Sequence, residues 1–261
     1  MNIDLSNQTA VVTGASSGIG KATAICLAKA GAKVFTGDIQ LREETSSQFE
    51  ELGIQEQVCD VTNLKQLQGL IDNAAEATGR LDILVNNAGI IMVKQVSDVS
   101  EDDWDRCIDT NVKSVFFGTK FALPHLLKTG GGAIVNTASN AGILPRSHDP
   151  VYSISKQAVV GMTRSLALCH SKDKIRVNCV CPGPVGDTEI MEEGLREYED
   201  REAATRKFIY ASPLARALDR MISPEEVANS ILYLVSDAAK MVTGTSMTID
   251  GGKSLGVPPE A

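Results

Sequence analysis

Short apolar runs rich in β-branched residues alternate along the chain with longer segments of helical pattern. The short runs predict seven strands, at residues 9–13, 33–38, 54–59, 82–86, 133–138, 175–180 and 246–249. The longer segments predict helices over residues 19–30, 41–52, 63–78, 101–128, 153–170 and 224–236. Several strands are apolar without strict alternation, as expected of strands that helices cover on both faces. The pattern therefore predicts an α/β fold with a doubly wound parallel sheet of about seven strands.

One polar segment, residues 187–222, interrupts this alternation. Its stretch "EIMEEGLREYEDRE" contains seven acidic residues, which are typical of a solvated helical face. A mobile lid over a cleft is the other interpretation, because long connections in compact domains are often functional. We find no internal repeat and no linker, and we expect one domain over residues 1–261 with a substrate loop or lid at about 187–222.

Composition and charge narrow the class of protein. Of the 261 residues, 43% are hydrophobic and 22% charged, which is ordinary for a globular protein. The net charge of −8 disfavours nucleic acid and anionic lipid as partners. No apolar run approaches the roughly 20 residues that cross a bilayer, and "MNIDLSNQTAVVTG" does not have the pattern of a signal peptide. The six cysteines and three histidines form no pattern of metal ligands, so we expect free thiols, no metal and a cytoplasmic location.

A glycine-rich turn, "TGASSGIG" at residues 13–20, follows the first predicted strand. Glycines at such a turn let the backbone approach a pyrophosphate, and the N-terminus of the next helix favours the negative charge. Asp38 ends the second strand, where a carboxylate can accept hydrogen bonds from both hydroxyls of an adenosine ribose. The same carboxylate would repel the extra phosphate of NADP, and Ser17 rather than an arginine accompanies the glycines. NAD is therefore the predicted cofactor. The alternative interpretation of Asp38 is that it only ends the strand and has no role in cofactor binding.

The stretch "VYSISK" places Tyr152 and Lys156 four residues apart. Residues at this spacing are neighbours on the face of any helix, which is a sufficient structural explanation by itself. A functional explanation is proton transfer, because a nearby ammonium group stabilises a phenolate and lowers the phenol pKa from its ordinary value of about 10.

"TGASSGIG", "NNAG" at 86–89, "YSISK" and "PGPV" at 182–185 occur in the order and at the intervals typical of the short-chain dehydrogenase/reductase family. The chain resembles this family over roughly residues 5–252. The resemblance implies a Rossmann-type fold and hydride transfer between a nicotinamide cofactor and a small secondary alcohol or its ketone. It implies that Tyr152 is the acid/base, that Lys156 lowers its pKa, that Ser139 binds the substrate oxygen and that Asn111 holds a water connecting Lys156 to solvent.

The resemblance also implies a set of cofactor-binding residues, which includes Tyr152 and Lys156. The remaining members are Gly14, Ser17, Gly18, Ile19, Gly20, Asp38, Asp60, Val61, Asn87, Ala88, Gly89, Pro182, Gly183, Val185 and Thr188. Turn geometry alone also explains the glycines and prolines among them. The family often has a threonine two residues after the valine of "PGPV", whereas Thr188 comes three residues after it. Either the loop carries one extra residue or Asp187 takes the place of the threonine.

We expect Asn140, the loop 143–151 and the segment 187–222 to form the substrate pocket. Arg146 and His148 are its distinctive polar candidates, and Arg146 is either a partner for a substrate carboxylate or an exposed loop residue. The expected substrate is a small polar alcohol or ketone, such as a polyol, sugar or hydroxy acid.

Three further expectations concern rival functions and assembly. The rivals are an NADPH-dependent 3-oxoacyl reductase, which Asp38 disfavours, and a non-catalytic nucleotide-binding regulator. A regulator would be free to lose catalytic residues, whereas this chain has all four. Family members are commonly homo-oligomers, so we expect a tetramer or dimer with the helices around 101–128 and 153–170 at one interface.

Overall fold

The computed structural model of the protein describes residues 3–144, 146–196 and 198–256. Pro145 of the predicted substrate loop and Glu197 of the acidic segment lie outside the described residues. A seven-stranded parallel sheet has the order β3-β2-β1-β4-β5-β6-β7. Its strands are β1 (Thr9–Thr13), β2 (Lys33–Asp38), β3 (Gln55–Val58), β4 (Ile83–Asn86), β5 (Gly132–Thr137), β6 (Ile175–Pro182) and β7 (Ser246–Ile249).

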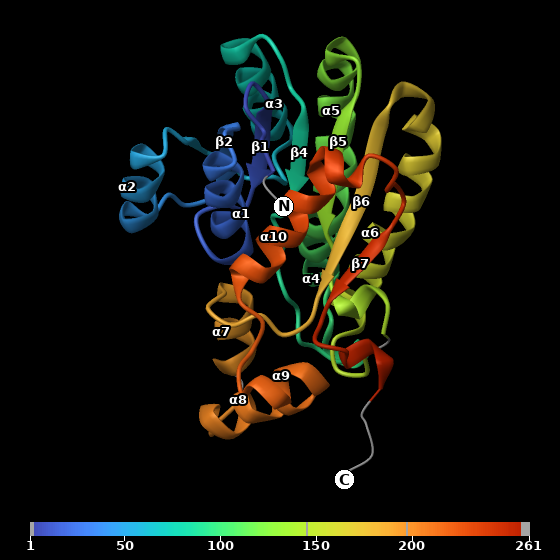
Figure 1. Cartoon of the computed structure of the whole chain (residues 1–261). Helices are drawn as coiled ribbons and strands as arrows, with labels where there is room; N and C mark the ends of the chain where they lie inside the picture. Colours follow the sequence, from blue (N-terminus) through green and yellow to red (C-terminus); the bar gives the residue numbers. More distant parts are fainter. Residues whose placement is uncertain (1–2, 145, 197, 257–261) are drawn as a thin grey trace.

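Helices cover both faces of this sheet (Figure 1). They are α1 (Gly18–Lys29), α2 (Glu43–Glu51), α3 (Leu64–Thr78), α4 (Glu101–Ile108), α5 (Ser114–Thr129), α6 (Pro150–His170), α7 (Glu189–Arg196), α8 (Arg201–Tyr210), α9 (Pro213–Leu218) and α10 (Pro224–Val235). Successive strand residues face opposite layers. Val12 belongs to the core under α1 and α10, whereas Val11 belongs to the core under α3 and α5. This two-sided burial is why the strand sequences lack polar alternation.

The predicted seven-strand α/β fold is confirmed, and the strand boundaries agree within two residues. The predicted helix over 101–128 is one continuous helical run in the structure. One turn of it, at Asp109–Lys113, is π-helical and separates α4 from α5. The side chain of Asn111, in this turn, hydrogen-bonds to Ile90 and Ser155, which lie far away in the sequence. Hydrophobic periodicity carries no signal of such contacts.

The polar segment 187–222 is largely helical and supplies α7, α8 and α9. These helices gather at the end of the molecule towards which the carboxyl ends of the strands point (Figure 1). The acids Glu192 and Glu202 are exposed and pair with Arg201 and Arg206, as expected of a solvated helical face. One helix of the segment, α7, also borders the cavity at the carboxyl ends of the strands.

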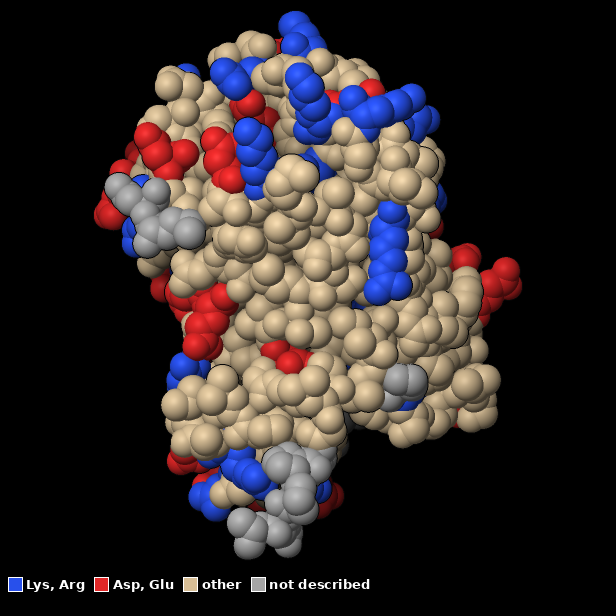
Figure 2. All heavy atoms as spheres, turned by 45° about the vertical axis from the view of Figure 1, so that its right-hand side comes forward, with Lys and Arg blue, Asp and Glu red and all other residues tan. Residues whose placement is uncertain are grey.

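The surface includes regions with few charges. Figure 2 shows a face on which lysine, arginine, aspartate and glutamate lie mostly towards the edges, and uncharged residues occupy much of the middle. Large apolar side chains on α4, α5 and α6 are exposed, among them Trp104, Phe116, Leu127, Ile154 and Leu168. In the described part of the chain, no helix combines the length and apolar character that crossing a membrane requires.

Candidate active site

A cavity of about 870 Å³ opens at the carboxyl ends of the strands, where the winding of the sheet reverses between β1 and β4. Ligands of open α/β sheets bind at this kind of reversal. Most of the predicted site residues line the cavity. They are Gly14, Ser17, Gly18, Ile19, Asp38, Asp60, Val61, Asn87, Ala88, Gly89, Ser139, Asn140, Arg146, His148, Tyr152, Lys156, Pro182, Gly183, Val185 and Thr188. Gly20 and Asn111 do not line it and lie behind the wall.

The glycine-rich turn has backbone positions that only glycine fills without strain. Gly14 has φ of +66°, and a Cβ atom there would lie 2.7 Å from the Cα of Ala88. A Cβ atom on Gly20 would lie 2.0 Å from the carbonyl oxygen of Gly14. The start of α1 is thereby packed directly against the turn, and Ser17, Gly18 and Ile19 at this start line the cavity. This arrangement fits the pyrophosphate of a dinucleotide.

Asp38 is fixed by backbone groups at the far end of the cavity. Its carboxylate accepts hydrogen bonds from the N–H of Ser16 (2.9 Å) and from the N–H of Gln40 (3.3 Å). Arg42 also lines the cavity. It was not predicted as a site residue, because it follows the second strand and lies far in the sequence from the glycine-rich turn. The Arg42 guanidinium forms an ion pair with Glu189 of α7, so the arginine is engaged across the mouth of the cavity.

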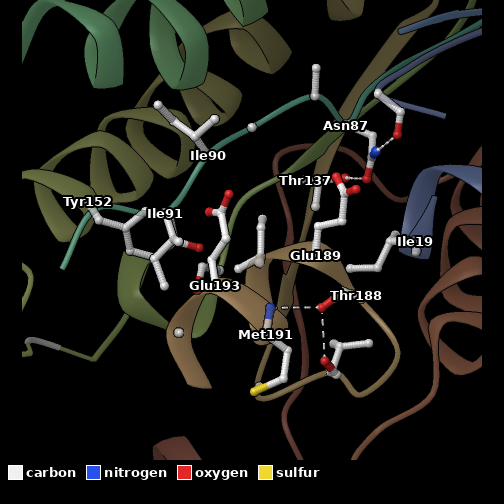
Figure 3. A pocket seen from close by; sticks show the side chains of 18 of the residues that line it. Ile19, Asn87, Ile90, Ile91, Thr137, Tyr152, Thr188, Glu189, Met191 and Glu193 are labelled. Carbon is white, nitrogen blue, oxygen red and sulfur yellow. Dashed lines mark hydrogen bonds between the residues drawn. The ribbon is translucent and has the colours of Figure 1, made fainter. Parts of the chain in front are cut away.

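Asn87 joins three strand ends at the centre of the site (Figure 3). Its amide nitrogen donates to the carbonyl oxygens of Thr13 (3.1 Å) and Gly14 (2.9 Å) after β1. Its amide oxygen accepts a hydrogen bond from the Thr137 hydroxyl at the end of β5 (3.1 Å). The asparagine of "NNAG" therefore holds the floor of the cavity together, beyond what turn geometry requires.

The side-chain amide nitrogen of Asn111 uses both of its N–H groups in hydrogen bonds within the protein. It donates to the Ile90 carbonyl (2.9 Å) and to the Ser155 hydroxyl (3.0 Å), and its oxygen accepts from the Ile90 N–H (2.8 Å). The Ser155 hydroxyl in turn donates to the carbonyl of Tyr152 (2.7 Å). The side chain of Asn111 thus ties the loop after β4 to the first turns of α6, which carry Tyr152 and Lys156.

Tyr152 and Lys156 both face the cavity from α6, and the tyrosine is shown in Figure 3. The Lys156 Nζ lies 5.7 Å from the centre of the Tyr152 ring and donates to the Thr137 carbonyl (3.0 Å). Gly89 leaves room for this lysine, because a Cβ atom there would lie 3.2 Å from the Nζ. Ser139, at the end of β5, lies beside the phenol. The side chains of the predicted acid/base, its lysine and the serine therefore meet in one place.

Burial is the largest influence on the electrostatics of Tyr152 and Lys156. Burial raises the pKa of Tyr152, and hydrogen bonding to Ser139 and the charge of Arg146 oppose this effect. Burial also lowers the pKa of Lys156 to about 8. The Arg146 guanidinium carbon lies 5.4 Å from the centre of the Tyr152 ring, and its charge favours the phenolate.

The wall opposite the glycine turn comes from α7 and the loop before it. Thr188 lies against Gly18, where a Cβ atom would be 3.0 Å from the threonine methyl carbon. The Thr188 hydroxyl donates to the Val185 carbonyl (3.1 Å) and accepts from the Met191 N–H (3.2 Å), as Figure 3 shows. Asp187 has φ of +51° and does not line the cavity. Of the two, Thr188 is therefore the residue that lines the cavity.

Several residues of the cavity wall were not singled out individually by the sequence, although Met191, Tyr198 and Phe208 lie in the segment 187–222 expected to form the pocket. They include Ile90, Ile91, Val93, Met191, Tyr198, Phe208 and Lys253. They belong to loops, to α7 and α8, and to the turn after β7, segments that only the folded chain brings together. Apolar residues of this kind in a short helix are indistinguishable from core residues in a sequence.

The buried lysine predicts a pH-dependent difference in stability between the native protein and Lys156→Met. The folded pKa of about 8 lies below the ordinary lysine value, so between these values the unfolded chain holds the proton and the folded chain does not. Stability therefore rises with pH in this window. From pH 7 to 9.5, the free energy of unfolding of the cofactor-free native protein should rise by about 2 kcal/mol relative to the variant. Chemical denaturation at both pH values measures this change, with the exposed Lys172→Met as control. A difference independent of pH contradicts it.

Comparisons with known proteins agree with this geometry. A family model described as enoyl-(acyl carrier protein) reductase matches residues 14–254. The 3beta-hydroxysteroid dehydrogenase 2 of Eggerthella lenta is 35% identical, over 96% of this chain and 96% of its own. The 3-oxoacyl-(acyl-carrier-protein) reductase FabG of Thermotoga maritima is 38% identical, over 95% of this chain and 98% of its own. A crystal structure of a short-chain type dehydrogenase/reductase from Mycobacterium marinum has a TM-score of 0.86 and 35% identity, and covers 96% of both chains. The chain therefore belongs to the short-chain dehydrogenase/reductase family of oxidoreductases.

Proposed function

We propose that this protein is an NAD-dependent oxidoreductase that interconverts a small secondary alcohol and its ketone, with Tyr152 as the acid/base. The observation that carries the proposal is the meeting of Ser139, Tyr152 and Lys156 in the cavity that the glycine-rich turn also lines. A non-catalytic nucleotide-binding regulator has no need of this arrangement. Arg146, His148 and Phe208 also line the cavity, which offers room for a substrate near the phenol.

The chain's own side chains account for the proton and the orientation of the substrate. When bound, a nicotinamide dinucleotide would accept a hydride from the alcohol during oxidation and donate one to the ketone during reduction. During oxidation, Tyr152 takes the proton of the substrate hydroxyl, and during reduction it returns this proton to the carbonyl oxygen. The Ser139 hydroxyl hydrogen-bonds to the same oxygen and stabilises the charge that develops there. Because burial raises the phenol pKa, the proton acceptor requires nearby positive charge, which Arg146, Lys156 and the oxidised cofactor supply.

Asp38 supports NAD rather than NADP as the cofactor. Its carboxylate is held at the adenosine end of the cavity by the N–H groups of Ser16 and Gln40, where it would face the ribose hydroxyls. A phosphate on the ribose would meet this negative charge. Arg42 lies at the same end, but its ion pair with Glu189 already engages its charge.

We also propose that the protein is a homo-oligomer, a dimer or a tetramer, that works as a cytoplasmic enzyme. The support for assembly is the exposure of Trp104, Phe116 and Leu168 on α4, α5 and α6, the helices expected at an interface. Exposed apolar side chains that gather on neighbouring helices favour association.

Replacing the phenol hydroxyl tests the mechanism. Tyr152→Phe keeps the aromatic ring and removes only the group that exchanges the proton, so kcat should fall at least about 10²-fold. Nicotinamide absorbance followed across a panel of secondary alcohols and ketones measures this loss. The matched control is Tyr210→Phe on α8, which is exposed and does not line the cavity. Equal turnover by the native enzyme and Tyr152→Phe would exclude the proposed role.

Cofactor choice depends on the charge at position 38. In the native enzyme, kcat/KM should be higher with NAD than with NADP. Asp38→Ala removes the repulsion and the ribose contact, so the ratio of kcat/KM for NADP to that for NAD should rise by about tenfold or more. Glu56→Ala, on the nearby strand β3, is a control for a loss of negative charge outside the cavity. A native preference for NADP overturns the assignment.

Light scattering tests the assembly. The mass in solution should be two or four times that of the 27.8 kDa chain. Phe116→Glu places a charge on the exposed apolar face of α5 and should shift the mass towards that of the monomer. Leu52→Glu, after α2 and outside the expected interface, should leave the mass unchanged. A native protein with the mass of a single chain contradicts the proposal.

A further inference from the structure

Three basic side chains line the substrate end of the cavity beside the phenol. Arg146 and His148 come from the loop before α6, and Lys253 comes from the turn after β7. The Arg146 guanidinium carbon lies 5.4 Å from the centre of the Tyr152 ring. Two acids that also line the cavity, Glu189 and Glu193, come from α7 (Figure 3). Arg146 is the charged residue whose contact with the Tyr152 ring places the basic group beside the proposed acid/base.

Arg146 is held in place by a buried carboxylate. Asp149 is fully buried and accepts hydrogen bonds from the Arg146 Nε (3.2 Å), from its Nη2 and from the Ser153 hydroxyl (3.0 Å). The Arg146 side chain is only 18% exposed. Among the residues that the structure describes, none accepts a hydrogen bond from the Arg146 Nη1. Asp149 thus orients the guanidinium and leaves part of its donor fork for a ligand.

Lys253 is presented to the cavity by a fixed turn. The carboxylate of Asp250 accepts hydrogen bonds from the N–H groups of Gly252 (2.9 Å) and Ser254 (2.8 Å), which flank the lysine. Lys253 forms no ion pair with the part of the chain that the structure describes. The two cations therefore differ. Asp149 partly neutralises Arg146, whereas Lys253 contacts no carboxylate among the described residues.

The basic side chains also repel one another. Burial lowers the pKa of Lys253, the charge of Arg146 lowers it further, and the charge of Asp250 opposes both effects. Burial, Arg146 and Lys253 together lower the pKa of His148. An anion bound among these side chains would relieve the repulsion, because each basic group would gain an opposite charge in a partly dry cavity.

We propose that the substrate is a short hydroxy acid, or the corresponding keto acid, whose carboxylate binds between Arg146 and Lys253. This inference rests on the proposed oxidoreduction at Tyr152 and adds the chemical class of the substrate. The short distance from Arg146 to the phenol ring places the carboxylate a few bonds from the reacting carbon. On oxidation the carbinol carbon loses a hydride to NAD and the hydroxyl loses its proton to Tyr152, while the carboxylate is unchanged.

Matched substrates test the charge requirement. Straight-chain hydroxy acids, with the hydroxyl two to four carbons from the carboxylate, are compared with their methyl esters and with amino alcohols of the same length. The best acid should exceed its ester in kcat/KM by about tenfold or more, because the ester has no charge for Arg146 and Lys253. Equal values for acid and ester, or a preference for the amino alcohol through Glu193, overturn the inference and leave the proposed oxidoreduction intact.

Two variants test the residues. Lys253→Met leaves no buried carboxylate without a partner. It should raise KM for the acid about tenfold, whereas KM for the uncharged ester should not change. Arg146→Lys keeps a cation beside Asp149 but loses the planar fork, and it should also raise KM for the acid. Lys240→Met, an exposed lysine outside the cavity, is the control. A KM for the acid that is unchanged in both Lys253→Met and Arg146→Lys contradicts the assignment.

A binding measurement separates this inference from the proposed function. At constant ionic strength, malonate and succinate should raise the Tm of the native protein, whereas their diamides should not. Lys253→Met should lose this stabilisation. Stabilisation by the dicarboxylates without turnover of any alcohol supports the anion site and overturns the proposed function. Equal stabilisation of the native protein and Lys253→Met overturns the anion site.

Discussion

The site depends on one constraint, the reversal of the sheet between β1 and β4. Because chain connections leave the sheet in opposite directions there, the carboxyl ends of the two strands border an open space that side chains do not fill. Asn87 keeps the strand ends at this reversal together, with hydrogen bonds to Thr13, Gly14 and Thr137. The floor of the cavity is thus as rigid as the sheet itself, and the glycine turn and α6 are positioned relative to it.

A second set of contacts places the proposed proton-transfer groups on this floor. The π turn at Asp109–Lys113 carries Asn111, whose amide joins the loop after β4 to Ser155 of α6. Tyr152 and Lys156 lie on either side of Ser155 along the same helix. Burial of these side chains disfavours both of their charged forms, since it raises the pKa of Tyr152 and lowers that of Lys156 to about 8. Positive charge from Arg146, from Lys156 and from an oxidised cofactor is therefore part of how the site would work.

The substrate end is built from segments that are distant in sequence. Arg146 precedes α6, Lys253 follows β7, and Met191 belongs to α7. Each reaches the cavity because the carboxyl ends of β5, β6 and β7 lie side by side in the sheet. A change of specificity in this architecture requires changes only in these connections, which leaves the sheet and the proposed cofactor end undisturbed.

The sequence by itself determined the seven strands, the helices that cover them and the positions of the glycine turn, Asp38, Tyr152 and Lys156. These features follow from local rules, because periodicity, strand–turn–helix order and helical spacing act within a few residues of the chain. Only the tertiary structure decided that the helix over 101–128 contains a π-helical turn at Asn111, that Thr188 rather than Asp187 reaches the site, and that Lys253 joins Arg146 beside the phenol. Those outcomes depend on hydrogen bonds and charges between residues far apart in the sequence, which no local pattern encodes.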